Sequence, residues 1–206
     1  MLELHDIETG YGASQVLFGV SLTITAGACV SLMGRNGMGN TTTVRAIMGQ
    51  LPLNAGSICR FGSDNGNRPS FEIARAGIGL VPEGRQIFSN LTVRENLQTF
   101  YRMPDGQTGG SWHLDRVLAL FPSLTERLDH AGNHLSGGEQ QMLAIGRALM
   151  TNPKLLILDE ATEGLAPIIR RQIWNCLRQL KQDGQSILII DKNVDAIARL
   201  ADHNYI

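Results

Sequence analysis

Residues 135–141 read Leu-Ser-Gly-Gly-Glu-Gln-Gln and include the start of a helical pattern over 137–150. Ser136 and Glu139 have the S-x-x-E spacing of a capping box, which marks the start of a helix. An ordinary helix cap accounts for these two residues but not for Gly137 and Gly138, because adjacent glycines weaken a first helical turn. Bare N–H groups at such a position allow an anion to approach closely. This stretch therefore indicates an anion contact at a helix N-terminus.

A second glycine-rich turn, residues 34–41, reads Gly-Arg-Asn-Gly-Met-Gly-Asn-Thr and joins an apolar strand pattern at 28–33 to a helical pattern at 41–48. It matches the phosphate-loop pattern G-x-x-x-x-G-K-[ST] except that Asn40 replaces the lysine. Taken alone, it also fits a turn that merely connects a strand to a helix. As a phosphate loop, its N–H groups and the helix N-terminus would hold phosphate oxygens. The residues expected at the phosphates are Gly34, Asn36, Gly37, Gly39, Asn40, Thr41 and Thr42.

An unbroken apolar run at 155–158 ends in the adjacent acids Asp159 and Glu160. Such a run is expected of a central parallel strand that is covered on both faces. Two acids there are costly to bury without a cation, although a purely structural carboxylate is the alternative for each. The other expected strands are 2–11, 16–24, 57–61, 78–81 and 187–190, and the other expected helices are 92–101, 113–129, 168–182 and 193–201. Their alternation predicts a mostly parallel sheet between helices, with an antiparallel portion near the start.

The composition fits one compact α/β domain. The chain has 206 residues, and 43% of them are hydrophobic, so we expect it to be neither disordered nor fibrous. Its formal charge of -1 gives no reason to expect nucleic-acid binding. It contains no apolar run long enough to span a bilayer, and its first residues do not have the pattern of a signal peptide. Cys29, Cys59 and Cys176 lie far apart, which fits a reducing compartment and lacks metal-ligand spacing.

Together, the 34–41 turn, the 135–141 stretch and the run ending at Asp159 resemble the phosphate loop, signature motif and Walker B strand of ABC ATPases. The resemblance covers essentially the whole chain, and the three motifs in this order are highly specific. It implies one P-loop NTPase domain over 1–206, with residues 1–82 and 152–206 as the core and residues 83–151 as a helical signature subdomain. It also implies a truncated C-terminal end, since family members run a few tens of residues beyond Ile206.

The resemblance implies a role for each matching position. Tyr11 resembles the aromatic residue that stacks on adenine, with a packed core tyrosine as the alternative. Thr41, Glu83 and Asp159 would hold Mg²⁺. Glu160 would polarise the attacking water as the general base.

The signature residues Ser136, Gly137 and Gly138 would contact the γ-phosphate of ATP held by the opposite subunit. Two chains would therefore enclose two nucleotides, as a homodimer or as a heterodimer with another ABC ATPase subunit. Residues 164–167 correspond to the loop that contacts the partner chain in the family.

Segments 81–85, 91–97 and 140–149 resemble the ATPases of branched-chain amino-acid and urea-type uptake systems. This resemblance implies an ATP-hydrolysing subunit that energises import of such a solute. Its partners would be membrane-embedded permease subunits, docked near residues 83–101, and indirectly a solute-binding protein. Such a subunit is peripheral on the cytoplasmic face of a bacterial cell membrane.

Two positions depart from the family pattern. Asn40 removes a charge-assisted hydrogen bond, so we expect ATP to bind roughly tenfold to a hundredfold more weakly. Lys192 stands where the wider family has histidine and this subfamily often has glutamine. One hypothesis is that Lys192 reaches the γ-phosphate, partly replaces the charge missing at Asn40 and takes a catalytic part. The alternative is a solvated lysine after a strand. The alternative function is a nucleotide-binding, hydrolysis-deficient regulatory or inactive paralogue.

Two other classes share the signature motif but fit less well. Chromosome-maintenance and DNA-repair ATPase heads carry a long coiled-coil insertion, and residues 41–135 have no sustained heptads. Ribosome-associated ABC proteins normally hold two such domains in one chain.

Overall fold

The computed structural model describes residues 1–34, 37–64, 68–103 and 111–206. At its centre lies a five-stranded parallel sheet with the strand order β6-β7-β8-β3-β9. These strands are β6 (Ile78–Val81), β7 (Leu155–Asp159), β8 (Ser186–Ile190), β3 (Cys29–Leu32) and β9 (His203–Tyr205). Every residue of β7 and β8 is buried, as predicted for central strands covered on both faces.

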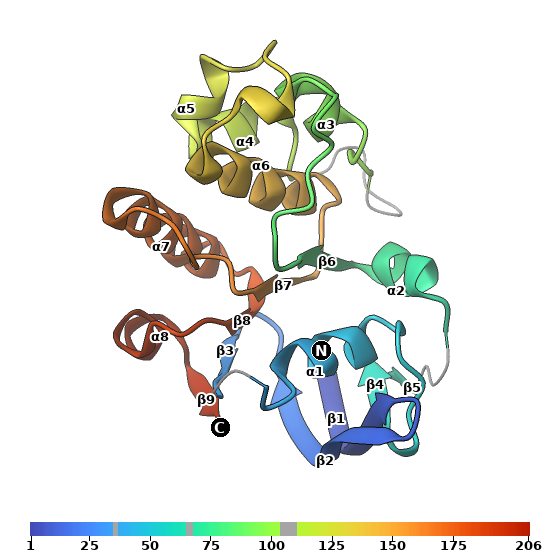
Figure 1. Cartoon of the computed structure of the whole chain (residues 1–206). Helices are drawn as coiled ribbons and strands as arrows, with labels where there is room; N and C mark the ends of the chain where they lie inside the picture. The colour runs from blue at the N-terminus through green and yellow to red at the C-terminus, as the bar shows by residue number, and fades with distance from the viewer. Residues whose placement is uncertain (35–36, 65–67, 104–110) are drawn as a thin grey trace.

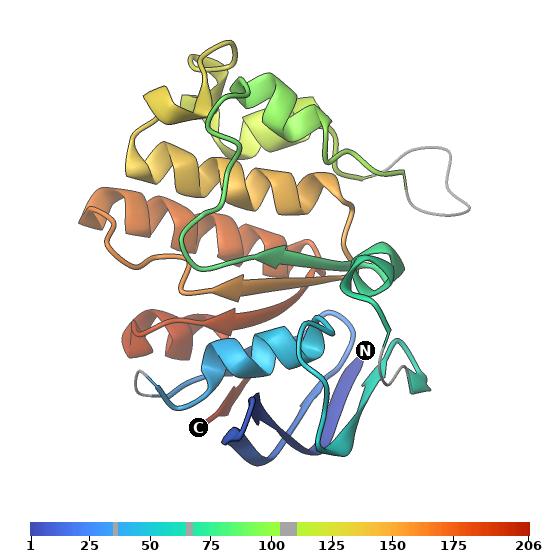
Figure 2. The ribbon, with the colours of Figure 1, turned by 45° about the vertical axis from the view of Figure 1, so that its right-hand side comes forward.

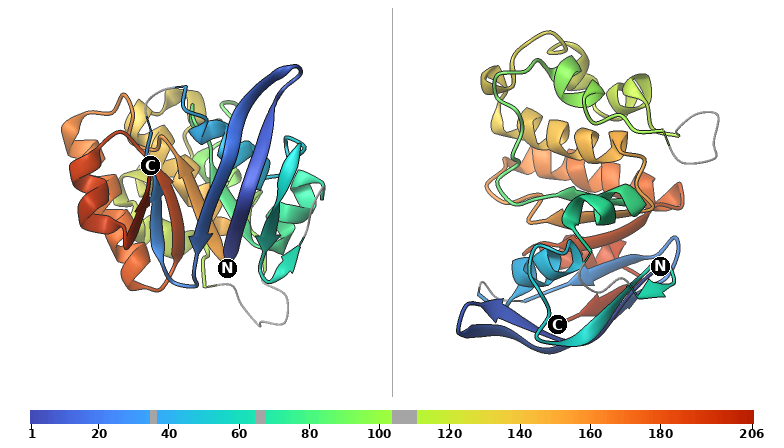
Figure 3. Two further views of the ribbon diagram at one scale, coloured as in Figure 1. Left: turned by 90° about the horizontal axis from the view of Figure 1, so that it is seen from below. Right: turned by 90° about the vertical axis from the view of Figure 1, so that its right-hand side faces the viewer.

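A separate antiparallel sheet with the order β2-β1-β4-β5 forms the outer layer (Figure 3). It consists of β2 (Ser14–Ile24), β1 (Leu2–Tyr11), β4 (Ala55–Arg60) and β5 (Ser63–Asp64). Helix α1 (Asn40–Ile47) lies between the two sheets (Figure 2). One buried apolar cluster joins Leu4 of β1, Ile47 of α1 and Ile157 of β7, so α1 is held from both sides.

The opposite face of the parallel sheet carries α7 (Pro167–Gln182) and α6 (Gly137–Met150), with the smaller helices beyond them (Figures 1 and 2). Those smaller helices are α3 (Val93–Gln98), α4 (Leu114–Leu120) and α5 (Pro122–Thr125), and α8 (Val194–Leu200) packs beside α7. A second apolar cluster connects Leu97, Leu143, Leu156 and Leu177 across these layers. No helix among the described residues combines the length and apolar character needed to cross a membrane.

The structure differs from the sequence predictions in two segments. The helix predicted over 113–129 is broken at Phe121 into α4 and α5, because Pro122 lacks an N–H and disfavours helical backbone at the residue before it. Residues 70–76, for which no helix was predicted, form α2 (Ser70–Ala76) after Pro69. The parallel core, the early antiparallel portion and helix α6 are confirmed.

Candidate functional site

The turn between β3 and α1 has left-handed backbone at two of its glycines. Gly37 and Gly39 have φ of 83° and 92°, a region that favours glycine. A Cβ on Gly39 would lie 2.6 Å from Leu17 Cδ2. The first turn of α1 carries no acidic side chain of its own, so no residue of that turn offsets the positive end of the helix dipole. Asn36, also expected at the phosphates, lies outside the described residues.

Asn40 places a neutral amide against the start of this turn. Its Oδ1 and Nδ2 atoms lie 3.1 and 3.2 Å from the position that a Cβ on Gly34 would occupy. An amide can donate hydrogen bonds but carries no charge. The loop therefore has the predicted shape in its described part, with a polar but uncharged group where the pattern has lysine.

Tyr11 lies at the end of β1 beside α1 and is 42% exposed, so it is not a core residue. Arg45 of α1 donates a hydrogen bond to its hydroxyl at 2.8 Å. The Arg45 guanidinium also lies 5.7 Å from the centre of the ring, and Thr42 Oγ1 is 3.5 Å from the Tyr11 hydroxyl. Sequence reasoning did not single out Arg45, which adds a cation beside the loop.

A cavity of about 430 Å³ joins the phosphate-loop end to the end of β7 and is lined by Thr41, Arg45, Glu83 and Asp159 among others. The structure thus brings together the three residues predicted to hold Mg²⁺. Burial raises the pKa of Asp159, a hydrogen bond with Thr41 opposes this shift, Glu83 adds to it and Arg45 lowers it.

The Asp159 carboxylate fits a cation. Its side chain is 3% exposed, and its Oδ1 atom has no hydrogen-bond partner among the described residues. A buried oxygen without a donor is costly, and a divalent cation satisfies carboxylate oxygens of this kind. The residues present therefore suit Mg²⁺, as the sequence predicted from adjacent acids after an apolar strand.

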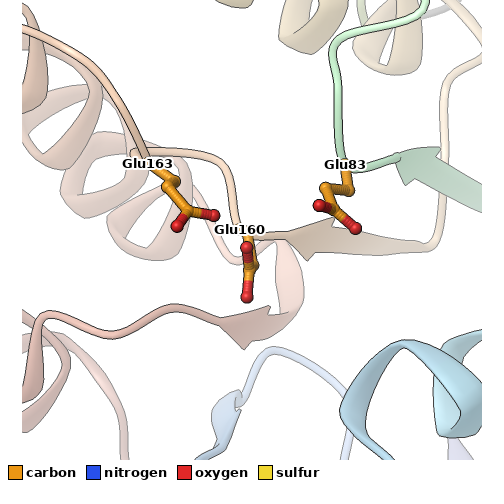
Figure 4. Close-up of side chains that lie close together, drawn as sticks. All are labelled: Glu83, Glu160 and Glu163. Atoms are coloured by element: carbon orange, nitrogen blue, oxygen red, sulfur yellow. The ribbon is translucent and has the colours of Figure 1, made fainter. Parts of the chain in front are cut away.

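Three carboxylates meet beside this cavity (Figure 4). Glu83 follows β6, and Glu160 and Glu163 lie in the turn after β7, with one oxygen of each within 4.8 Å of the others. A hydrogen bond with Glu163, burial and the Glu163 charge raise the pKa of Glu160 to about 7, against the influence of Lys192. The pKa of Glu163 is lowered by its hydrogen bonds with Glu160 and Lys192. The pair is therefore arranged to hold one proton, mainly on Glu160.

Lys192 pairs with both acids of this turn. Its Nζ atom lies 2.5 Å from Glu163 Oε1 and 3.4 Å from Glu160 Oε1. Asp191, next to it, accepts hydrogen bonds from the backbone N–H and the hydroxyl of Thr162 at 3.1 and 2.6 Å. The segment after β8 is thus tied to the turn after β7. Sequence reasoning missed Glu163 as a partner of Glu160 and Lys192.

Ser136 caps α6 as predicted. Its hydroxyl accepts from Glu139 N at 3.3 Å, and Glu139 Oε2 accepts from Ser136 N at 2.7 Å. A Cβ on Gly137 would lie 2.9 Å from Arg85 Nη1, and one on Gly138 would lie 2.8 Å from Ile169 Cγ2. Gly138 therefore has a packing reason besides any anion contact, whereas the flexible end of Arg85 could move aside for a side chain at position 137.

The N-terminus of α6 and the 34–41 turn belong to opposite sides of the parallel sheet (Figure 2). One chain therefore does not bring Ser136, Gly137 and Gly138 to its own phosphate loop. If these residues contact the same nucleotide, a second chain must supply them.

Comparisons with known proteins agree with this geometry. The sequence profile of the ABC transporter family matches residues 17–163. The high-affinity branched-chain amino acid transport ATP-binding protein BraG of Pseudomonas aeruginosa is 43% identical, over 100% of this chain and 88% of its own length. The Nod factor export ATP-binding protein I of Rhizobium meliloti is 37% identical, over 98% of this chain and 59% of its own length.

Solved structures show the same fold. The crystal structure of a nucleotide-free ATP-binding cassette from an ABC transporter superimposes with a TM-score of 0.84 at 29% identity, covering 100% of this chain and 86% of the other. A dimeric ATP-binding cassette in a post-hydrolysis state bound to ADP and Pi gives 0.82 at 26% identity, covering 98% of this chain and 92% of the other. The chain therefore belongs to the ABC transporter family and has the fold of its ATP-binding cassettes.

Proposed function

We propose that this chain is the ATP-binding subunit of an ABC importer for branched-chain amino acids or a related small solute. The nucleotide part rests on one observation: Thr41 and Asp159 line the same cavity beside the phosphate-loop turn, and Asp159 Oδ1 has no hydrogen-bond partner among the described residues. The solute class is supported by the 43% identity to BraG, whose name states branched-chain amino acid transport.

In this proposal, residues 34–42, including Asn36, hold the phosphates and the exposed ring of Tyr11 stacks on the base. Thr41, Glu83 and Asp159 hold Mg²⁺, which offsets phosphate charge when bound. Glu160 takes the proton of the attacking water, and a pKa of about 7 leaves it able to do so near neutral pH.

A second ATPase subunit, identical or different, supplies Ser136, Gly137 and Gly138 to each nucleotide. Permease subunits dock near residues 83–101, and the chain sits on the cytoplasmic face of the membrane with a solute-binding protein on the other side. The dimeric cassettes among the structural relatives support the two-chain arrangement.

One specific pair of observations favours a second candidate, a nucleotide-binding but hydrolysis-deficient subunit. Asn40 brings no charge to the phosphates, and Lys192 is paired with Glu160 and Glu163 rather than free to replace it. In this candidate, the ATP-driven closure of two chains remains while turnover depends on the partner's site.

Purified chain and the Asn40→Lys variant should be compared for Mg²⁺-ATP affinity and steady-state phosphate release. We expect the variant to bind ATP roughly tenfold to a hundredfold more tightly, the range of one charge-assisted hydrogen bond. Phosphate release by both proteins that disappears in Glu160→Gln would support the ATPase. Release by the Asn40→Lys variant alone would support the second candidate, and failure of both proteins to bind ATP would refute the proposal.

The solute is tested separately by uptake of labelled leucine in cells that lack their own ATPase subunit and express this chain with its permease. Uptake that requires the chain supports the proposed class. Unchanged leucine uptake, with ATP binding intact in vitro, would refute the solute assignment alone.

A further inference from the structure

A groove of about 530 Å³ is lined by residues of α7 and α8 and by Asn193, which precedes α8. The two helices lie side by side (Figure 1). Four arginines line it: Arg170, Arg171 and Arg178 from α7 and Arg199 from α8. Arg170 and Arg171 lie four and three residues before Trp174, and Arg178 lies four residues after it, so all of them lie near Trp174 on one side of α7. No acidic residue is among the described residues that line the groove.

The charge of this groove is not balanced by ion pairs. Among the described residues, none of its arginines forms a salt bridge with a carboxylate, and Arg178 donates only to the side-chain oxygen of Asn175. The neighbouring cations are paired instead, Lys181 with Asp202 at 2.6 Å and Arg116 with Asp183 at 3.0 Å. Gathered like charges repel one another, so the groove is set to attract an anion.

Arg170 also lines the adjacent cavity of about 280 Å³ that holds Glu160, Glu163 and Lys192. It therefore faces acids as well as the groove. The other three arginines, Arg171, Arg178 and Arg199, are exposed and do not line that cavity.

The groove also contains a buried donor without an acceptor. Trp174 lines it and is 6% exposed, and its Nε1–H has no hydrogen-bond partner among the described residues. A buried indole N–H normally donates to an acceptor, because without that hydrogen bond the free-energy cost of removing the group from water is not offset. The wall of the groove therefore carries an unsatisfied donor at Trp174.

From these observations we propose that the α7–α8 groove binds a small organic or inorganic anion that carries at least two phosphate or carboxylate groups. Arginine forks match both groups through paired hydrogen bonds. The volume of the groove lies in the range of small-molecule sites. The site is separate from the nucleotide cavity and does not depend on the proposed function.

Fluorescence of Trp174 reports on the site directly. The chain has two tryptophans, so a Trp112→Phe background leaves Trp174 alone. Tripolyphosphate and citrate should each change its emission at low ionic strength, with binding that weakens as salt is added. Tighter binding of one probe tells whether phosphate or carboxylate is the preferred group. Calorimetry of the unmodified chain repeats the titration if Trp112→Phe impairs folding.

The localising variant is Arg171→Gln/Arg199→Gln, which should bind the probes at least about tenfold more weakly, as expected for lost charge-assisted hydrogen bonds. The matched control is Arg94→Gln/Arg127→Gln, which removes two exposed arginines paired elsewhere and should leave affinity unchanged. The proposal is overturned if neither probe binds, if the groove variant binds as well as the control, or if only anionic vesicles or DNA bind through Arg171 and Arg199.

Discussion

Replacement of Glu163 by glutamine should lower the pKa of the Glu160 carboxyl. Glu163 is the first cause of the raised value of about 7, through its hydrogen bond and its negative charge. The variant removes the charge and offers an amide N–H that favours the ionised form of Glu160. We expect a fall of about one to two pKa units, which corresponds to roughly 1.4–2.7 kcal/mol between the two protonation states. Lys192→Gln should shift the pKa in the opposite direction, because Lys192 lowers it.

The assay is carbon-13 NMR of glutamate carboxyl groups across a pH series, with the Glu160 signal assigned by its loss in Glu160→Gln. Phosphate release gives the functional counterpart. A base with a pKa of about 7 is roughly a tenth ionised at pH 6 and nine-tenths at pH 8, so the rate should rise several-fold over this interval and flatten in Glu163→Gln.

The raised pKa of Glu160 also makes the free energy of unfolding depend on pH. A carboxyl whose pKa is raised on folding stabilises the chain below its unfolded value near 4.5, and this contribution is lost as pH rises through about 7. Glu163→Gln should reduce that loss, whereas Glu72→Gln on α2 serves as a distant control. The reasoning is refuted if Glu163→Gln leaves the Glu160 titration unchanged, or if Glu163→Gln and Lys192→Gln shift it in the same direction.

Three further predictions concern the loop, the buried acid and the helix cap. Asp159→Asn should raise the melting temperature of the metal-free chain, since burial disfavours the charge, and should abolish the Mg²⁺ dependence of ATP binding; a lower melting temperature would contradict this. Ser136→Ala should lower the free energy of unfolding by about 1 kcal/mol, measured with urea, and should impair ATP-dependent dimerisation. The control is Thr92→Ala in the capping box of α3, which should cost similar stability and leave the dimer intact. Gly39→Ala should destabilise by more than about 1 kcal/mol and more than Gly12→Ala, which also has positive φ but open space around it; equal costs would remove the steric argument.

Much of the fold follows from local patterns in the sequence. The start and end of α6 at Gly137 and Met150 match the predicted 137–150, because a capping box fixes the first turn. Strand β7 follows from an apolar run that needs cover on both faces. The break at Phe121 follows from Pro122, which the predicted helix over 113–129 did not take into account.

The candidate site was predictable where a motif specifies both residue type and backbone. Thr41 and Asp159 line the same cavity because β3 and β7 belong to one parallel sheet, with β8 between them, and the carboxyl ends of parallel strands lie at the same edge of the sheet. The pairing of Lys192 with Glu163 was not predictable in this way. It depends on Glu160 adopting a φ of 52°, a conformation outside the usual range for such a residue, and on how the turn then places Glu163.

Asn40 and Lys192, the two departures from the family pattern, are connected by the charges around the cavities of about 430 and 280 Å³. Four carboxylates, those of Glu83, Asp159, Glu160 and Glu163, surround this region, and Lys192 is already paired with two of them. Moving the lysine to a phosphate would leave Glu160 and Glu163 facing each other without their cation. Lys192 therefore does not offset the loss of charge at Asn40 without a cost at Glu160, the proposed general base. A divalent cation would instead supply the missing positive charge. It would lie next to the buried Asp159 Oδ1 atom, which has no partner among the described residues.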